Sequence, residues 1–184
     1  MRKDSRLKMV STAAALIQRR GVTATSFSEV VADSGAPRGS IYHHFPDGKE
    51  QLAGDAINWT LDRVMAHQRA CKARTPQGVI DCFIDLWRQT VIDSDATAGC
   101  VVAGVALDTT PEAAGLMGLV RSAFRTWLDL IAEQLHATGM PVRRARSVAI
   151  AALAGMEGAM ILCRAERSVE PLEVVAAELK RLVA

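Results

Sequence analysis

The sequence lacks the patterns that mark β-sheet and repeat proteins. Nothing in its 184 residues alternates apolar and polar positions with a period of two, and no internal repeat or low-complexity tract is present. The chain is therefore not built from half-buried strands or stacked repeats. Because 49% of the residues are hydrophobic, the composition also disfavours intrinsic disorder.

Patterns for cysteine chemistry and metal binding are also missing. The four cysteines, at positions 71, 82, 100 and 163, form no C-x-x-C pair. Each lies in an apolar or helical context, so we expect reduced thiols in the core. We expect no metal site and no cofactor.

The sequence contains neither a recognisable signal peptide nor a convincing membrane span. The charged residues 1–6 run into an amphipathic helix and lack an apolar core. The most apolar run, residues 148–163, is interrupted by Glu157 and is rich in alanine and glycine. We expect it to be too short and too weakly hydrophobic to cross a bilayer. The chain is therefore predicted to be cytoplasmic, with no membrane partner.

No catalytic constellation is visible either. The sequence has no H-x-x-H or G-x-S-x-G motif. His43 and His44 are adjacent, so on a helix they point about 100° apart and cannot readily share a metal. We expect no catalytic residues, and an all-α enzyme remains only a disfavoured alternative.

What the sequence does contain is helical periodicity along nearly its whole length. The patterns predict an all-α protein of about nine helices, with a head at residues 1–47 and a body at 48–184. Cationic residues and Gly21 end the first helix, whereas Ser26 and Glu29 have capping-box spacing at the start of the second. The other expected segments are a third helix from Pro37 to Phe45, a long helix at 49–72, a helix opening at Thr75-Pro76, a short apolar segment at 100–107, a helix from 109–112 to about 136, and helices at 142–166 and 171–183.

Charge is distributed unevenly between head and body. Residues 1–50 carry eight Lys or Arg against five acids, a net charge of +3, whereas residues 51–184 carry fourteen against fifteen, a net charge of −1. A basic head on a nearly neutral body fits an anionic partner for the head alone.

Residues 26–45 have the form of a DNA-reading helix-turn-helix. Gly35 and Ala36 allow a tight turn, Gly39 keeps the backbone uncovered, and Ile41 and Phe45 anchor the second helix. A guanidinium is able to bind guanine bidentately, while hydroxyl, imidazole and ammonium groups suit base edges or phosphates. Charge and spacing alone also allow an ordinary surface helix with solvated side chains. The predicted DNA-facing residues are Thr25, Ser26, Pro37, Arg38, Gly39, Ser40, Tyr42, His43, His44 and Lys49.

The head closely resembles that of TetR-family transcriptional regulators. The matching stretches are TSFSEVVA at 25–32, SGAPRGSIYHHF at 34–45 and KEQL at 49–52, together covering roughly the first 55 residues. Pro37 departs from the usual serine or threonine and removes a hydroxyl that would bind phosphate. The linker at 46–48 is one residue longer than the commonest form, and with AGCVVAGVAL at 98–107 it resembles the LmrA/YxaF-type branch.

This resemblance implies a homodimeric repressor on a palindromic operator of double-stranded DNA, released by a small lipophilic or aromatic molecule. A ligand-independent DNA-binding protein is the alternative. The middle helices are expected to hold the effector, with Asp62, Asp85, Arg88 or Arg121 available to orient a polar group. The candidate effector residues are Trp59, Phe83, Trp87, Phe124 and Trp127.

The helix around 145–163 is apolar nearly all round, so it has to be covered on more than one side. With the apolar stripe of the last helix, it suits a four-helix dimer interface, and completion of a monomer core is the competing interpretation. The predicted interface residues are Ala152, Gly155, Met156, Ala159, Cys163, Leu172, Val175 and Leu179.

Overall fold

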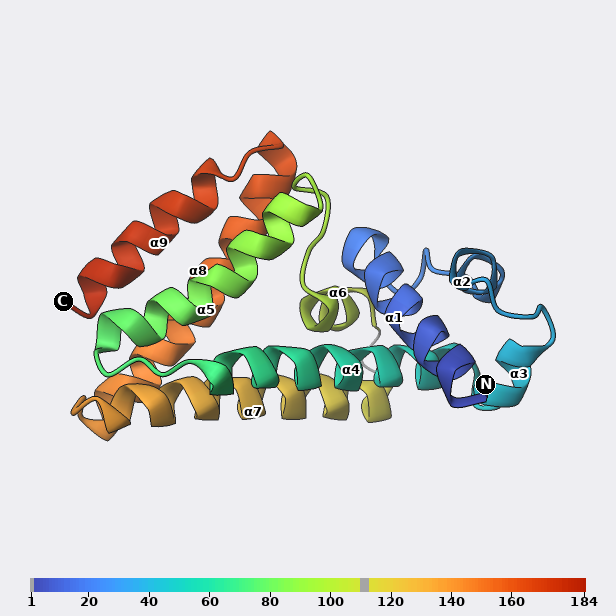
Figure 1. Cartoon of the computed structure of the whole chain (residues 1–184), viewed down its shortest axis with the longest axis horizontal. Coiled ribbons are helices and arrows are strands. Elements are labelled where there is room, and N and C mark those ends of the chain that lie inside the picture. Colours follow the sequence, from blue (N-terminus) through green and yellow to red (C-terminus); the bar gives the residue numbers. More distant parts are fainter. Residues whose placement is uncertain (1, 110–112) are drawn as a thin grey trace. The chain divides into compact units, whose positions relative to one another are not determined.

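A computed structural model of the chain describes residues 2–109 and 113–184, with side chains from residue 4 onward. The described residues form nine helices and no strand, which confirms the predicted all-α fold (Figure 1). The predicted helix start at 109–112 falls almost entirely outside the described residues. The helices are α1 (Arg2–Arg20), α2 (Phe27–Ser34), α3 (Ser40–His44), α4 (Gly48–Ala70), α5 (Pro76–Asp93), α6 (Val101–Asp108), α7 (Ala114–Ala137), α8 (Val142–Glu166) and α9 (Glu170–Leu182).

Local sequence signals set several helix ends as predicted. Ser26 caps α2, its side chain accepting the backbone N–H of Glu29, while the Glu29 carboxylate accepts the backbone N–H of Ser26. The Ser26 hydroxyl also donates to this carboxylate at 2.7 Å, and together with the Ser26 N–H and the Arg20 guanidinium it holds the pKa of Glu29 below its usual range. Gly35 ends α2 in the left-handed conformation, with φ of 66°. Thr75 caps α5 and is followed by proline in the first turn.

The chain divides into two compact units. The first unit comprises the residues up to Asp62 together with Cys100–Ala123, and the second unit comprises Arg63–Gly99 and Phe124–Ala184. Helices α4 and α7 therefore each contribute to both units. The predicted boundary at residue 47 marks the end of the helix-turn-helix motif. The two units are instead defined by which residues pack together.

The core of the first unit joins α1, α2, α3 and the start of α4. Its buried residues are Met9, Val10, Ala13, Leu16, Val30, Val31, Ile41, Phe45 and Leu52. Helix α6 also packs against α1. A Cβ on Gly104 would lie 3.4 Å from the carbonyl oxygen of Ile17, so the two helices are in direct contact at this glycine. The Asp108 carboxylate, at the end of α6, accepts the backbone N–H of Thr23.

The second unit is built on α5, α8 and α9, which contact one another pairwise (Figure 1). Helix α5 is joined to α9 by ion pairs between Arg88 and Glu173 and between Asp81 and Lys180. The Arg88 guanidinium lowers the pKa of Glu173, and the carboxylate in turn raises the pKa of Arg88. These contacts fix α5 to the last helix of the chain.

Helix α8 corrects one expectation from sequence. The apolar run predicted to be too short for a membrane span belongs to a helix of 25 residues, an 18-residue window of which has a mean hydropathy of 1.6, and among the described residues it alone is long and apolar enough to cross a bilayer. Within the apolar window, 44% of the residues are buried inside the protein. Because α5 and α9 pack against it, core packing accounts for the buried part of this apolar character.

Candidate nucleic-acid interface and effector site

The third helix is shorter than predicted. Residues 37–39 form a turn closed by a hydrogen bond of 2.9 Å from the Ser40 N–H to the Pro37 carbonyl, and α3 begins only at Ser40. The Ser40 hydroxyl donates to the same carbonyl at 2.7 Å. Because glycine is a poor helix former, Gly39 favours a turn over an additional helical turn at this point. Arg38 therefore projects from a turn that precedes the helix.

The two faces of α3 differ sharply in exposure. Ile41 and Phe45 are each 1% exposed and belong to the core of the first unit, which confirms their predicted role as anchors. Tyr42 is 69% exposed, with its ring 5.7 Å from Phe27 in an edge-on arrangement. His43 is exposed as well. The buried residues thus anchor this five-residue helix to the core, while its polar side chains remain on the surface.

The remaining predicted DNA-facing residues are distributed unequally. Pro37, Arg38 and Gly39 are exposed, whereas Ser26, Ser40, His44 and Lys49 are half-buried. Nothing lies within 4 Å of a Cβ placed on Gly39, so the backbone there is open. The Lys49 ammonium donates to the Thr23 carbonyl at 2.8 Å, which leaves it two further N–H donors for an anion.

The structure corrects the prediction that Thr25 faces DNA. Its side chain is 3% exposed and its hydroxyl donates to the Gly21 carbonyl at 2.7 Å. The hydroxyl therefore stabilises the loop after α1 and is not available to a phosphate. Sequence spacing placed Thr25 correctly near the start of α2 but could not show that its side chain turns inward.

The structure also corrects the predicted dimer residues on α8 and α9, because they lie on faces that pack against their own chain. Ala152, Met156, Ala159, Cys163, Leu172 and Leu179 are buried within their own chain, and a Cβ on Gly155 would lie 3.2 Å from Val175. Burial raises the pKa of the Cys163 thiol. These residues join α8 to its own neighbours and complete the core of the second unit, which was the competing interpretation.

A different face of α8 is apolar and exposed. Ile150, Ile161 and Leu162 are 48%, 64% and 49% exposed, and Val174 on α9 is 58% exposed. Small residues Ala151, Ala154, Gly158 and Ala165 on α8 are exposed as well. We call these eight residues the outward apolar face. Sequence analysis missed this face because a helix that is apolar nearly all round gives no indication of which side its own chain covers.

Three of the five candidate effector residues come together in the second unit. Trp87 and Trp127 are stacked with ring centroids 5.3 Å apart, and Phe83 lies edge-on to both at 5.8 and 5.7 Å. All three are buried, yet neither indole N–H finds a hydrogen-bond partner among the described residues. Trp59 instead packs against the core of the first unit, and Phe124 is half-buried.

One of the polar residues predicted to orient the effector already has charged partners. Arg88 is held by Glu173 and Asp85, so it is already neutralised. An open depression between α7 and α8 is lined by Asp129, Ala132, Glu133, His136, Val142 and Arg146, and by none of the five candidate effector residues.

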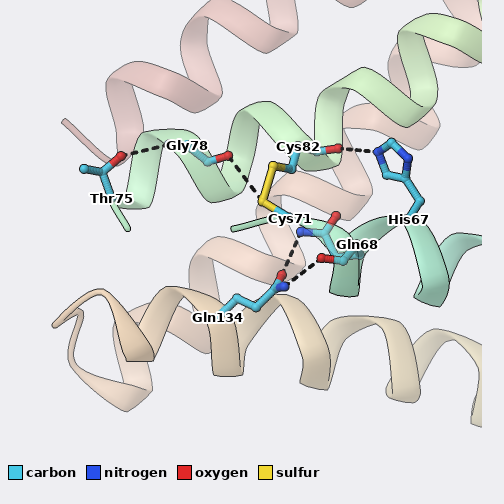
Figure 2. Close-up of a disulfide and its surroundings, with 7 residues drawn as sticks. All are labelled: His67, Gln68, Cys71, Thr75, Gly78, Cys82 and Gln134. Atoms are coloured by element: carbon cyan, nitrogen blue, oxygen red, sulfur yellow. Dashed lines mark hydrogen bonds between the residues drawn. A yellow bond between two sulfur atoms is a disulfide. The ribbon is translucent and has the colours of Figure 1, made fainter. Parts of the chain in front are cut away.

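The cysteines provide the clearest correction. Cys71 and Cys82 form a disulfide, with Cα atoms 6.1 Å apart (Figure 2). Cys100 and Cys163 are not disulfide-bonded. The expectation of four reduced core thiols was therefore wrong for this pair. Their separation of 11 residues is not a recognisable motif, because only the turn between α4 and α5 brings the two sulfurs together.

A basic head with a helix-turn-helix whose second helix is polar outside and anchored inside defines a DNA-binding regulator. Comparison with known proteins agrees. Residues 10–56 match the bacterial regulatory proteins of the tetR family, and residues 76–178 match the LmrA/YxaF-like C-terminal domain of transcriptional regulators. The chain belongs to the TetR family of transcriptional regulators, with an LmrA/YxaF-like C-terminal domain, and it is not an enzyme.

Individual relatives cover nearly the whole chain. The uncharacterised HTH-type regulator Rv0196 of Mycobacterium tuberculosis is 37% identical over 97% of this chain and 93% of its own length. The HTH-type regulator LmrA of Bacillus subtilis is 30% identical over 92% of this chain and 91% of its own length. A cysteine mutant of the TetR-family regulator CifR, solved with 26-base-pair operator DNA, has a TM-score of 0.76 at 19% identity, covering 96% of this chain and 95% of that one.

Proposed function

We propose that the chain is a dimeric repressor that binds a palindromic operator and is released by a lipophilic or aromatic small molecule. In this proposal residues 1–47 contact DNA and residues 48–184 dimerise and bind the effector. The observation that carries it is the division of α3 into a buried anchoring side and an exposed side bearing Tyr42 and His43, directly after the exposed Arg38. Since bacterial DNA lies in the cytoplasm, we place the protein there.

The proposed DNA contacts fall into base-reading and phosphate-binding groups. Arg38 is the candidate for bidentate contact with guanine O6 and N7 in the major groove. Ser40 and His43 reach base edges or phosphates, and Tyr42 and His44 bind backbone oxygens. Lys49 stands in the first turn of α4, where the helix dipole also favours phosphate. Ser26, Pro37 and Gly39 complete this surface through their backbone or small side chains.

We propose that the outward apolar face of α8 and α9 forms the dimer interface. Its exposed isoleucines, leucine and valine are costly to leave in water, and its alanines and glycine allow a second helix to approach closely. A twofold dimer places the same face on both copies. Two recognition helices about one turn of DNA apart, roughly 34–36 Å, then read the two halves of a palindrome.

The proposed effector site is the aromatic cluster of Phe83, Trp87 and Trp127. Apolar rings favour a lipophilic or aromatic molecule, and the two unpartnered indole N–H groups favour one with a hydrogen-bond acceptor. Insertion between the rings requires α5 and α7 to separate, because Trp127 lies on α7 and the other two rings lie on α5. A ligand that binds this separated state more tightly lowers operator affinity.

The decisive experiment is selection of bound sequences from random duplex DNA, repeated with a panel of hydrophobic compounds. We expect a palindromic site whose recovery falls when an effector is present. Recovery of no preferred sequence would contradict the operator assignment. If a preferred sequence is recovered but no pocket-binding compound changes the affinity of the protein for it, the chain is instead a ligand-independent DNA-binding protein.

A further inference from the structure

We propose that the Cys71–Cys82 disulfide is a reversible switch through which the thiol redox state of the cell sets operator affinity. The proposal rests on the proposed function above and adds a second input to it. It starts from the position of the bond in the chain: Cys71 follows Ala70, the last residue of α4, and Cys82 lies within α5.

Helix α4 connects this bond to the recognition helix. It begins at Gly48, four residues after the end of α3, and continues without a break to Ala70. Its first part belongs to the first unit and its last turns to the second. A change in how its last turn is held therefore acts on the same helix that follows the DNA-facing segment.

The other half of the disulfide sits on a firmly held helix. The Arg88 guanidinium donates two hydrogen bonds to the Glu173 carboxylate, at 2.5 and 2.9 Å, and Gln77 donates to the Val183 carbonyl at 2.9 Å. Both contacts join α5 to the C-terminal end of the chain. With the disulfide closed, the end of α4 is covalently fixed to this held helix.

Without the bond, weaker contacts remain at the end of α4. A ring nitrogen of His67 lies 3.1 Å from the Cys82 carbonyl oxygen, and Gln68 and Gln134 exchange hydrogen bonds of 2.7 and 2.8 Å (Figure 2). Hydrogen bonds of this kind break and form readily compared with a covalent crosslink. Reduction therefore widens the range of positions open to the last turns of α4.

The surroundings of the bond suit thiol exchange. Both cysteines are partly exposed, so a small thiol can reach them. Arg69, Lys72 and Arg74 lie near Cys71 in the sequence, and Asp81, the acid next to Cys82, is paired with Lys180. Positive charge of this kind stabilises a thiolate and makes it a better leaving group. The Cys71 sulfur lies 4.0 Å from the Gly78 carbonyl oxygen, an acceptor for the S–H of the reduced state.

The exchange balances with a low-molecular-weight thiol and its disulfide as the redox couple. A thiolate RS⁻ attacks one protein sulfur, the bond between the two cysteine sulfurs breaks, and the released cysteine thiolate takes a proton from water. A second RS⁻ attacks the mixed disulfide, releasing RSSR and the other cysteine, which is also protonated. The reverse sequence consumes RSSR and closes the bond.

The cellular setting favours a switch over a permanent crosslink. A DNA-binding regulator works in a reducing compartment, where disulfides in most organisms are transient or redox-sensing. A buried bond would resist the thiol pool, whereas a partly exposed one equilibrates with it. The location of the pair thus fits a signal that enters at the end of α4.

The test begins with the full-length wild-type protein equilibrated against mixtures of reduced and oxidised glutathione, followed by alkylation of free thiols and mass spectrometry. We expect the Cys71–Cys82 pair to pass from disulfide to dithiol within the range of these mixtures. A pair that stays fully oxidised or fully reduced across the whole range would overturn the proposal.

Operator affinity of the two forms is then measured on the DNA recovered by selection. We expect the operator Kd to differ by about fivefold or more between oxidised and reduced protein, the lower end of usual coupling between sites. Hydrogen exchange of amides 63–70 is expected to speed up on reduction. The double variant Cys71→Ser/Cys82→Ser should behave like the reduced form and ignore glutathione.

Cys100→Ser is the matched control, because serine can also accept the Ala103 N–H that Cys100 accepts at the start of α6. It should keep the full redox response. Equal operator affinity in both redox states would overturn the switch and leave the proposed function standing. If neither form binds any selected DNA, the proposed function fails and the switch fails with it.

Discussion

The exposed surfaces of α3 and α8 are opposites. On α3 the side chains left in water are polar, while the apolar ones, Ile41 and Phe45, are buried. On α8 apolar side chains, including Ile150 and Ile161, remain exposed even after its buried face is filled. A polar, cationic surface beside an ordinary core suits an anion, whereas a second apolar face suits another protein surface. One chain thus exposes two surfaces of different chemistry, and substitutions can test the roles proposed for each.

The largest expected effect is on the apolar surface. Ile161→Asp should convert the proposed dimer to monomer, weakening association by about 3 kcal/mol or more, because a buried isoleucine is worth about 1.5–3 kcal/mol and a twofold interface contains two copies. Sedimentation equilibrium measures this directly. Ile92→Asp is the matched control, since Ile92 is 57% exposed on α5. If Ile92→Asp abolished the dimer and Ile161→Asp did not, the interface would not be the outward apolar face.

The next effect concerns base reading on the polar surface. Arg38→Ala should weaken operator binding by about 1–3 kcal/mol and relax the preference at one base in each half-site. Repeating the sequence selection with the variant shows both changes. Arg143→Ala, at an exposed position in α8, should change neither. Unaltered affinity and preference in the Arg38 variant would remove the base-reading assignment.

A smaller effect is expected for the phosphate contact. Lys49→Ala should weaken binding to all sequences alike and lower the slope of log affinity against log salt by about one per subunit. Titrations at several salt concentrations measure that slope, with Arg143→Ala again as the control. A loss confined to one sequence would instead mean that Lys49 reads a base.

The smallest effect is a pH dependence within the first unit. Because the folded state lowers the pKa of Glu29 from its ordinary value of 4.5, its stabilisation is fully present above pH 4.5. It is lost as the pH falls through the lower folded value. Glu29→Gln keeps a capping-box side chain but removes this titration. Thermal melts should show the variant less stable than wild type at pH 7, with the gap closing in acid. A gap that widens in acid would contradict the assignment.

Helix ends and the anchors of α3 were predictable because they depend on neighbours in sequence. Ser26 with Glu29, Thr75 with Pro76, and Gly35 each satisfy or stop a helix locally. A short apolar pair at spacing four, Ile41 and Phe45, was enough to orient α3. These features need no knowledge of the rest of the fold.

The errors came from features that depend on distant residues. A spacing of 11 residues does not reveal that Cys71 and Cys82 meet, because the intervening turn decides their distance. The apolar residues of α8 were identified, but periodicity did not separate the face covered by α5 and α9 from the face left open. Trp59 looked like its fellow tryptophans in sequence, yet it packs against the helix-turn-helix core.

The contact between α6 and α1 has a consequence for how the DNA-binding segment can be handled. The carboxylate of Asp108 occupies the space beside Gly21, where a Cβ would come within 2.8 Å of it, and satisfies the backbone of Thr23. The loop that leads into α2 is therefore stabilised in part by Asp108, a residue more than eighty positions downstream. The helix-turn-helix is not a portable module: a chimaera that transplants it has to bring α6 along.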